Sequence, residues 1–247
     1  MIESPDMNKT AQAPVHLAWT AGWDSTFRLL QLLLIDQCSV QPHYIVRPEA
    51  STGQEIDAMH RIRRRLLGEH PEARERLKPT ALTDVRAIPI EPDLAAEYEH
   101  IKQSRKVQYQ YLLLACYCRQ RGLDEIEIGI HKDDSGFHLA EEALFECFSL
   151  PMQHFSKLEM RQEAQDHGFA HIMDLTVFCR RPRGGKPCGF CGPCHDAVTI
   201  GMGYRLPLLR RLRGYMQAPL RRWWRSNYAS MSPKLKSRAS RILKGRY

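Results

Sequence analysis

Short apolar runs alternate along this chain with longer segments in which apolar residues recur every three or four positions. The short runs predict buried strands over residues 15–20, 43–47, 85–90 and 125–130. The periodic segments predict helices over residues 27–36, 54–67, 104–121, 139–148 and 156–167. Ser156 and Glu159 have the spacing of a capping box at the start of the last helix. Strands that alternate with helices favour an α/β fold, with one parallel sheet and helices on both faces.

Three parts of the chain differ in composition. Residues 1–14 lack the apolar region of a secretory signal, and we expect a disordered lead-in there. Residues 15–200 contain every predicted strand and helix and form the main domain. Of the 36 basic residues, 13 follow Asp196, and no acidic residue does, which leaves 23 basic against 28 acidic residues before that point. Residues 201–247 are therefore predicted to form a basic amphipathic tail.

The apolar segments and the cysteines bear on where the protein works. The longest aliphatic run, residues 29–35, is far shorter than the ~20 residues that a spanning helix needs. Four scattered cysteines lie in apolar or helical surroundings and are expected to stay reduced: Cys38, Cys116, Cys118 and Cys147. We therefore expect a cytoplasmic protein.

Four further cysteines lie close together between residues 178 and 197. They are Cys179, Cys188, Cys191 and Cys194. Four thiolates from one short loop suit a tetrahedral Zn²⁺, and a site closed by four sulfurs holds structure rather than activating water. Two disulfides or unrelated thiols are the alternatives, and His195 is an alternative metal ligand.

A loop of small and polar residues follows the first predicted strand. It reads Thr20-Ala21-Gly22-Trp23-Asp24-Ser25-Thr26 and leads into a predicted helix. A strand, a small-residue loop and a helix can cradle phosphate, because backbone N–H groups and the positive end of the helix point at the anion. The alternative is a tight turn without a ligand.

Two motifs together resemble one family. The loop resembles the SGGxDS phosphate loop (PP-loop) of the N-type ATP pyrophosphatases, and the spacing C-x₈-C-x₂-C-x₂-C resembles the zinc motif of the 7-cyano-7-deazaguanine synthases. Residues 129–137 and 156–160 are similar to further segments of that family. The resemblance implies an adenine nucleotide alpha hydrolase-like fold and an ATP-dependent ligase of 7-deazaguanine (queuosine-type) biosynthesis. Such an enzyme adenylates a carboxylate, lets ammonia displace AMP, and dehydrates the amide to a nitrile after a second activation.

The resemblance also implies roles for individual residues. Asp24 would position Mg²⁺ beside ATP, Ser25 would add a hydrogen bond, and Asp133 or Asp134 would lie near the reacting groups. The residues implied for nucleotide binding are Trp19, Thr20, Ala21, Gly22, Trp23, Asp24, Ser25, Thr26 and Lys157.

The chain departs from the family at several points. Ala21 replaces a glycine, and residues 104–111 and 137–140 lack the family's substrate-side motifs. ATP binding is therefore better supported than deazaguanine as the substrate. Two alternatives stay open: a ligase that acts on another carboxylate or on RNA, and a catalytically inactive nucleotide-binding protein recruited by its tail.

The tail combines leucines and tryptophans with arginines. Trp223 and Trp224 lie among Arg221, Arg222 and Arg225, in a segment too polar to span a bilayer. This composition suits an anionic membrane surface, and it also suits RNA. A disordered solubilising extension is the plain alternative. The expected partners are therefore a small-molecule carboxylate, ammonia, and either a membrane or RNA, with a homodimer left open.

Overall fold

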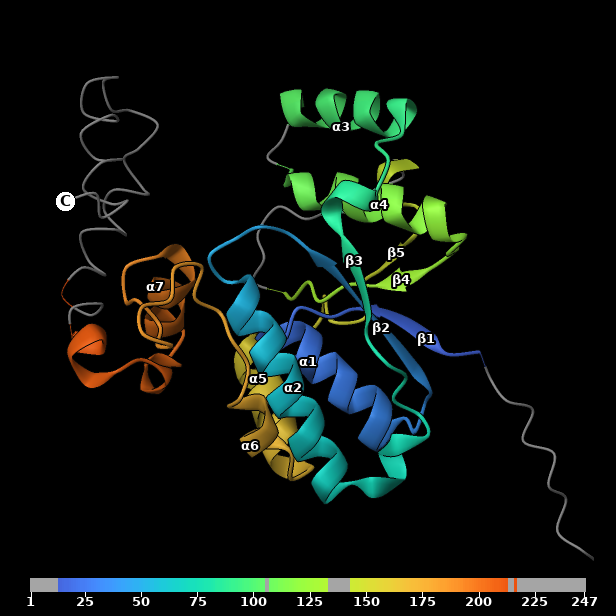
Figure 1. The fold of residues 1–247 in the computed structure, drawn as a ribbon. Helices are drawn as coiled ribbons and strands as arrows, with labels where there is room; N and C mark the ends of the chain where they lie inside the picture. The colour runs from blue at the N-terminus through green and yellow to red at the C-terminus, as the bar shows by residue number, and fades with distance from the viewer. Residues whose placement is uncertain (1–12, 105–106, 133–142, 213–215, 217–247) are drawn as a thin grey trace, which may run out of the picture.

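A parallel five-stranded sheet forms the centre of the protein (Figure 1). The computed structural model describes residues 13–104, 107–132, 143–212 and 216. The strands are β1 (Val15–Ala18), β2 (Val40–Val46), β3 (Ala81–Asp84), β4 (Ile126–Glu127) and β5 (Phe148–Ser149). They lie in the order β3-β2-β1-β4-β5, and every neighbouring pair is parallel. The predicted α/β class is confirmed.

Helices cover both faces of this sheet, as the sequence predicts (Figure 1). One face carries α1 (Trp23–Leu30), α2 (Thr52–Glu69), α5 (Lys157–Asp166) and α6 (Ala170–Met173). The other face carries α3 (Pro92–Ser104) and α4 (Tyr109–Arg121), which pack against each other. A further helix, α7 (Gly192–Thr199), follows the cysteine-rich loop.

Each face of the sheet packs into its own apolar core. Leu17 and Trp19 point into the core beneath α1 and α2, whereas Ala18 and Ile45 pack against the core beneath α4. This alternation is the period-two pattern of a strand buried on both faces. The first core also contains residues from the end of the described chain: Cys179, Cys188, Cys194, Val198, Met202 and Leu206. The cysteine-rich segment is therefore part of the main domain.

The third strand lies earlier than predicted. β3 ends at Asp84, and residues 85–87 form a 3₁₀ turn in place of the predicted strand over 85–90. The side chain of Asp84 accepts a hydrogen bond from the backbone N–H of Arg86 at 2.8 Å. This local bond competes with strand pairing, which is why the apolar pattern of 85–90 misleads.

Two helix predictions also need correction. The helix predicted over 104–121 starts only at Tyr109, and a separate helix, Pro92–Ser104, precedes it. Within the described part of the predicted helix 139–148, residues 143–145 form a 3₁₀ turn and residues 148–149 form β5. Phe148 pairs with Ile126 and packs in the second core, so burial against the sheet overrides the helical pattern.

The strand order creates a crevice at one edge of the sheet. The chain runs outward from β1 through β2 to β3, and then crosses back to place β4 on the other side of β1. Ligands of open α/β sheets bind at the carboxyl ends of the strands where the order reverses in this way. That point lies between β1 and β4.

Candidate functional site

The loop between β1 and α1 is a sharp turn at this reversal point. Ala21 has a φ of +52°, in the left-handed region that glycine favours, and its side chain is fully buried. Gly22 is the N-cap of α1, with an extended backbone and no side chain to cap the helix. The amides of the first helical turn, at Trp23, Asp24 and Ser25, therefore form the kind of helix N-terminus that binds anions.

Gly129 brings the loop after β4 against this first turn. A Cβ atom at position 129 would lie 2.7 Å from the backbone nitrogen of Ser25 and 3.2 Å from the Cβ of Asp24. A bidentate ion pair holds the two elements at this distance, with Arg28 Nε 2.7 Å from one Glu127 oxygen and Nη2 2.8 Å from the other. Burial lowers the pKa of Arg28, but the hydrogen bonds and charge of Glu127 outweigh it and raise the pKa.

The start of α5 brings a lysine to the same place. Lys157 Nζ lies 3.4 Å from a carboxylate oxygen of Asp24, and both side chains are mostly buried. The predicted capping box fixes this helix start: the backbone N–H of Ser156 donates to the Glu159 carboxylate at 2.7 Å, and the N–H of Glu159 donates to the Ser156 hydroxyl at 3.2 Å. Two predicted site residues that lie far apart in the sequence thus meet.

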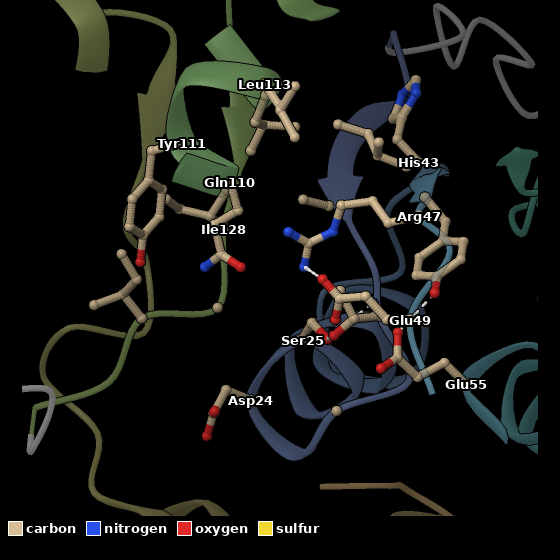
Figure 2. Close-up of a pocket in the computed structure, with 18 of the residues that line it drawn as sticks. Asp24, Ser25, His43, Arg47, Glu49, Glu55, Gln110, Tyr111, Leu113 and Ile128 are labelled. Carbon is tan, nitrogen blue, oxygen red and sulfur yellow. Dashed lines mark hydrogen bonds and ion pairs between the residues drawn. The ribbon is translucent and has the colours of Figure 1, made fainter. Parts of the chain in front are cut away.

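A cavity of about 250 Å³ opens beside the loop. Figure 2 shows Asp24 and Ser25 at one end, with Tyr111 of α4 across from Arg47 and Glu49. The volume is near the lower end of ligand pockets, ~300 Å³ and upward, so it suits one part of a nucleotide or a small acyl substrate rather than a whole ATP molecule.

Polar groups in this cavity are held by one another. Arg47 pairs with Glu49 at 3.0 Å, and the Tyr44 hydroxyl donates to Glu55 at 2.7 Å. Burial and this bond to Glu55 raise the pKa of Tyr44. Burial, with the charges of His16 and Arg121, lowers the pKa of His43 to about 4, so its ring is neutral near pH 7.

Sequence reasoning did not identify these lining residues. Their position along the chain could have indicated them, because residues 47 and 49 follow the end of β2 and therefore lie at the carboxyl edge of the sheet.

Some predicted site residues have structural roles instead. Trp19 and Thr26 are fully buried, and the Trp19 indole N–H donates to the Thr26 hydroxyl at 3.0 Å. Trp23 is also buried, and its ring faces the guanidinium of Arg205 at 4.9 Å. Thr20 is exposed, with its hydroxyl 3.5 Å from that of Ser25. Asp133 and Asp134 lie outside the described residues.

The four clustered cysteines converge on one point. Their Sγ atoms all lie within 4.8 Å of one another, and three of the separations are 3.4, 3.9 and 3.9 Å. A tetrahedron of sulfurs ~2.3 Å from a central ion has edges of ~3.8 Å, whereas a disulfide is ~2.05 Å long. The cluster therefore fits a four-coordinate metal ion better than disulfides. His195 is not part of it: His195 Nδ1 lies 3.5 Å from the Thr199 hydroxyl.

Backbone amides support this cluster. The N–H of Cys188 donates to Cys179 Sγ at 3.1 Å, and the N–H groups of Phe190 and Cys191 donate to Cys188 Sγ at 3.4 Å. Hydrogen bonding with Cys179 and Cys194 lowers the pKa of the Cys191 thiol. The bond to Cys191 raises the pKa of Cys179 to about 11, so four thiolates would need a cation among them.

The segment that carries the cysteine cluster is hydrogen-bonded directly to the loop between β1 and α1. The backbone N–H of Val177, two residues before Cys179, donates to the Ala21 carbonyl at 2.9 Å. Arg205, which follows α7, lies between the rings of Trp23 and Phe178 at 4.9 and 4.8 Å. Its Nη2 donates to the Thr176 carbonyl at 2.6 Å, and burial lowers its pKa.

Comparison with known proteins identified no similar protein. No family model, no curated protein and no solved structure matches this chain. The functional conclusions below therefore depend on the motifs and on the geometry of the site.

The close approach of Gly129 to α1 generates a first prediction. Gly129→Ala should lower the free energy of unfolding by about 1–3 kcal/mol, because the new methyl meets backbone atoms that cannot move aside. The measurement is equilibrium denaturation in urea. Gly53→Ala in α2 is the control, since a Cβ there meets nothing within 4 Å and should be neutral or stabilising. An equal free energy of unfolding for the two variants would contradict the close approach of Gly129 to α1.

The left-handed conformation of Ala21 generates a second prediction. Ala21→Gly should change the free energy of unfolding by no more than about 1 kcal/mol, because relief of the φ strain offsets the loss of one buried methyl. Ala21→Val should cost at least about 2 kcal/mol, since a β-branched side chain is both strained and too large at this buried position. Thermal denaturation of the two variants distinguishes them, and a stable valine variant would argue against this backbone conformation.

Proposed function

We propose that this protein is an ATP-dependent ligase that splits ATP between its α- and β-phosphates, as the N-type ATP pyrophosphatases do. The observation that carries the proposal is the meeting of Asp24, Lys157 and the first turn of α1 beside a cavity at the reversal point of the sheet. An anion-binding helix start, a lysine and a carboxylate are what a polyphosphate with Mg²⁺ requires. The resemblance of residues 20–26 to the phosphate loop supports the same assignment.

The proposed reaction activates a carboxylate. A carboxylate oxygen attacks the α-phosphorus, the bond to the β-phosphate oxygen breaks, and pyrophosphate leaves. Ammonia then attacks the acyl carbon, AMP leaves, and a proton is lost, which gives an amide. In the nitrile-forming version the amide oxygen is adenylated by a second ATP, and loss of AMP and of the nitrogen-bound protons leaves the nitrile.

The chain's own residues bind and orient in this scheme. The amides of α1 would hold the phosphates, Lys157 would neutralise their charge, and Asp24 would take a Mg²⁺ ion, which supplies charge neutralisation when bound. Arg47 is the sole lysine or arginine among the described residues that line the cavity, and it suits a carboxylate substrate.

A catalytically inactive nucleotide-binding protein is the second candidate function. The methyl of Ala21, which occupies a left-handed position where the family has glycine, favours it. A ligase on a different carboxylate or on RNA would retain the same ATP chemistry.

Turnover tests the main proposal. With ATP, Mg²⁺, ammonium and candidate acids, the protein should release AMP and pyrophosphate, as measured by chromatography, with an amide or nitrile of matching mass. Asp24→Ala and Lys157→Ala should each reduce the rate by about 100-fold or more, because each removes a charge at the reacting phosphates. Lys102→Ala is the control, since Lys102 also pairs with a carboxylate (Glu99, 2.9 Å) but lies far from the cavity, on α3. Release of ADP would exclude the pyrophosphatase chemistry.

The metal of the cysteine cluster is proposed to be a structural Zn²⁺. All four positions of a tetrahedral ion are filled by sulfur, which leaves none for water or substrate. Such an ion would hold residues 178–197 against the loop at Ala21, and would not take part in the reaction.

Metal analysis tests this assignment. The purified protein should contain one zinc per chain, and Cys188→Ser should lose the metal and unfold at a lower temperature, because structural zinc binding is coupled to folding. Cys38→Ser is the control, since Cys38 is a free cysteine outside the cluster. Stable, zinc-free protein would refute the assignment, as would zinc loss in the control.

We place the enzyme in the cytoplasm, with residues 201–247 holding it at a polyanionic surface. Among the described residues, no helix is both long and apolar enough to cross a membrane. The basic composition of residues 201–247 favours an anionic lipid surface or RNA as the partner, and a homodimer is a further expectation for the assembly.

A further inference from the structure

The helical segment after the cysteine cluster exposes its apolar side chains. Residues 208–212 and 216 are helical. Leu208 is 65% exposed, Leu209 80%, Leu212 51% and Met216 76%. Leu208 and Leu212 are four apart, so they lie along one face of the helix over residues 208–212, and Leu209 extends that face. Met216 is a further exposed apolar side chain of the same part of the chain. An amphipathic helix of a globular protein ordinarily buries such a face in the core.

The arginines of this segment point inward. Arg210 Nη1 donates to the carbonyl of Pro187 at 2.6 Å, and Arg211 Nη2 donates to the carbonyl of Tyr204 at 3.1 Å. A Cβ at Gly189 would lie 2.8 Å from the Cβ of Arg210, so the segment packs closely on the cysteine-rich loop. The orientation, with charge inward and leucine outward, is therefore set by specific contacts.

A basic turn lies next to this apolar face. Arg183 and Lys186 exchange two backbone hydrogen bonds (3.0 and 3.2 Å) around Gly184 and Gly185, both of which have positive φ, in a tight hairpin turn. Arg210 also contacts the carbonyl of Lys186, which places the turn beside the helical segment. The exposed basic residues of the loop are Arg180, Arg181, Arg183 and Lys186, and none forms a salt bridge within the described part of the chain.

We propose that this basic–apolar surface (the apolar residues 208, 209, 212 and 216 with the basic residues 180, 181, 183 and 186) docks on an anionic lipid bilayer. The leucines would enter the boundary between headgroups and acyl chains, while the arginines and lysine would meet the anionic headgroups. The enzyme would lie on the membrane without crossing it. This inference goes beyond the proposed catalytic function and does not depend on it.

The chemistry of the surface favours lipid over its rivals. RNA could bind the basic residues. Its bases stack on aromatic side chains, however, and none of the four exposed apolar side chains of this surface is aromatic. A second copy of the chain would cover the leucines, but it would bring two unpaired basic turns together, which is unfavourable. A bilayer with anionic headgroups satisfies both halves of the surface at once.

Co-sedimentation of the full-length protein with lipid vesicles tests the proposal. The protein should bind vesicles of phosphatidylcholine and phosphatidylserine, and it should bind pure phosphatidylcholine vesicles far more weakly. The double variant Leu208→Glu, Leu209→Glu should lower vesicle binding at least about tenfold. The double variant Arg183→Gln, Lys186→Gln should also weaken it and reduce its dependence on salt. Leu82→Glu is the control, because Leu82 is 54% exposed on β3, away from this surface, and should bind normally.

Four parallel measurements distinguish the possible outcomes: zinc content, AMP release, RNA binding and sedimentation velocity. Zinc content and AMP release of the leucine variant should match the unmodified protein, so a failure of the ligase proposal is distinguishable from a failure here. Leucine variants that still bind vesicles normally would overturn the proposal. Binding to single-stranded RNA that depends on the basic residues, without vesicle binding, would assign the surface to RNA. A dimer by sedimentation velocity that the leucine variant converts to a monomer, again without vesicle binding, would assign it to a second copy.

Discussion

The close packing of the loop after β4 on the first turn of α1 is the constraint on which the candidate site depends. Only a residue without a Cβ fits at position 129, and the bidentate pair between Arg28 and Glu127 holds the strand and the helix at that separation. Because β1 and β4 are neighbours in the sheet, their carboxyl ends meet where the strand order reverses. The start of α5 lies beside this contact, and there Lys157 forms an ion pair with Asp24.

The cysteine cluster and the loop between β1 and α1 are joined by direct contacts. The segment leading into Cys179 is hydrogen-bonded to Ala21, and Arg205 holds Trp23 and Phe178 on its two sides. A cation close to two aromatic rings is a favourable contact, and it connects the two segments. The strained backbone of Ala21 is therefore held in place from the side of the cysteine cluster, which explains how an alanine persists in a left-handed conformation.

Local patterns in the sequence were sufficient to predict some of these features but not others. β1 and residues 44–46 of β2 could be predicted because these short segments are mostly apolar and pack into the cores on both faces of the sheet. The cysteine cluster could be predicted because its spacing is local. The strand β5 could not, because its two residues owe their conformation to pairing with β4.

The candidate site divides in the same way. The turn at residues 20–26 has a local signature. Lys157 was assigned to nucleotide binding by a family resemblance alone, and its contact with Asp24 is seen only in the structure. Arg47, Glu49 and Glu55 carry no motif, and they meet because the parallel order brings the ends of distant segments together. That information lies in the tertiary arrangement and not in any window of the chain.

The contribution of residues up to Leu206 to the first core has a consequence for synthesis. Leu17 and Trp19 are among the first core residues to leave the ribosome, yet Cys194, Val198 and Leu206 of the same core are among the last. Contacts of such long sequence separation form late and slowly. Helices α1 and α2 can cover part of the central strand early, but this core stays incomplete until nearly the whole domain has been synthesised. An interrupted chain would therefore leave part of this core exposed, and chaperones and proteases would recognise the chain as incomplete.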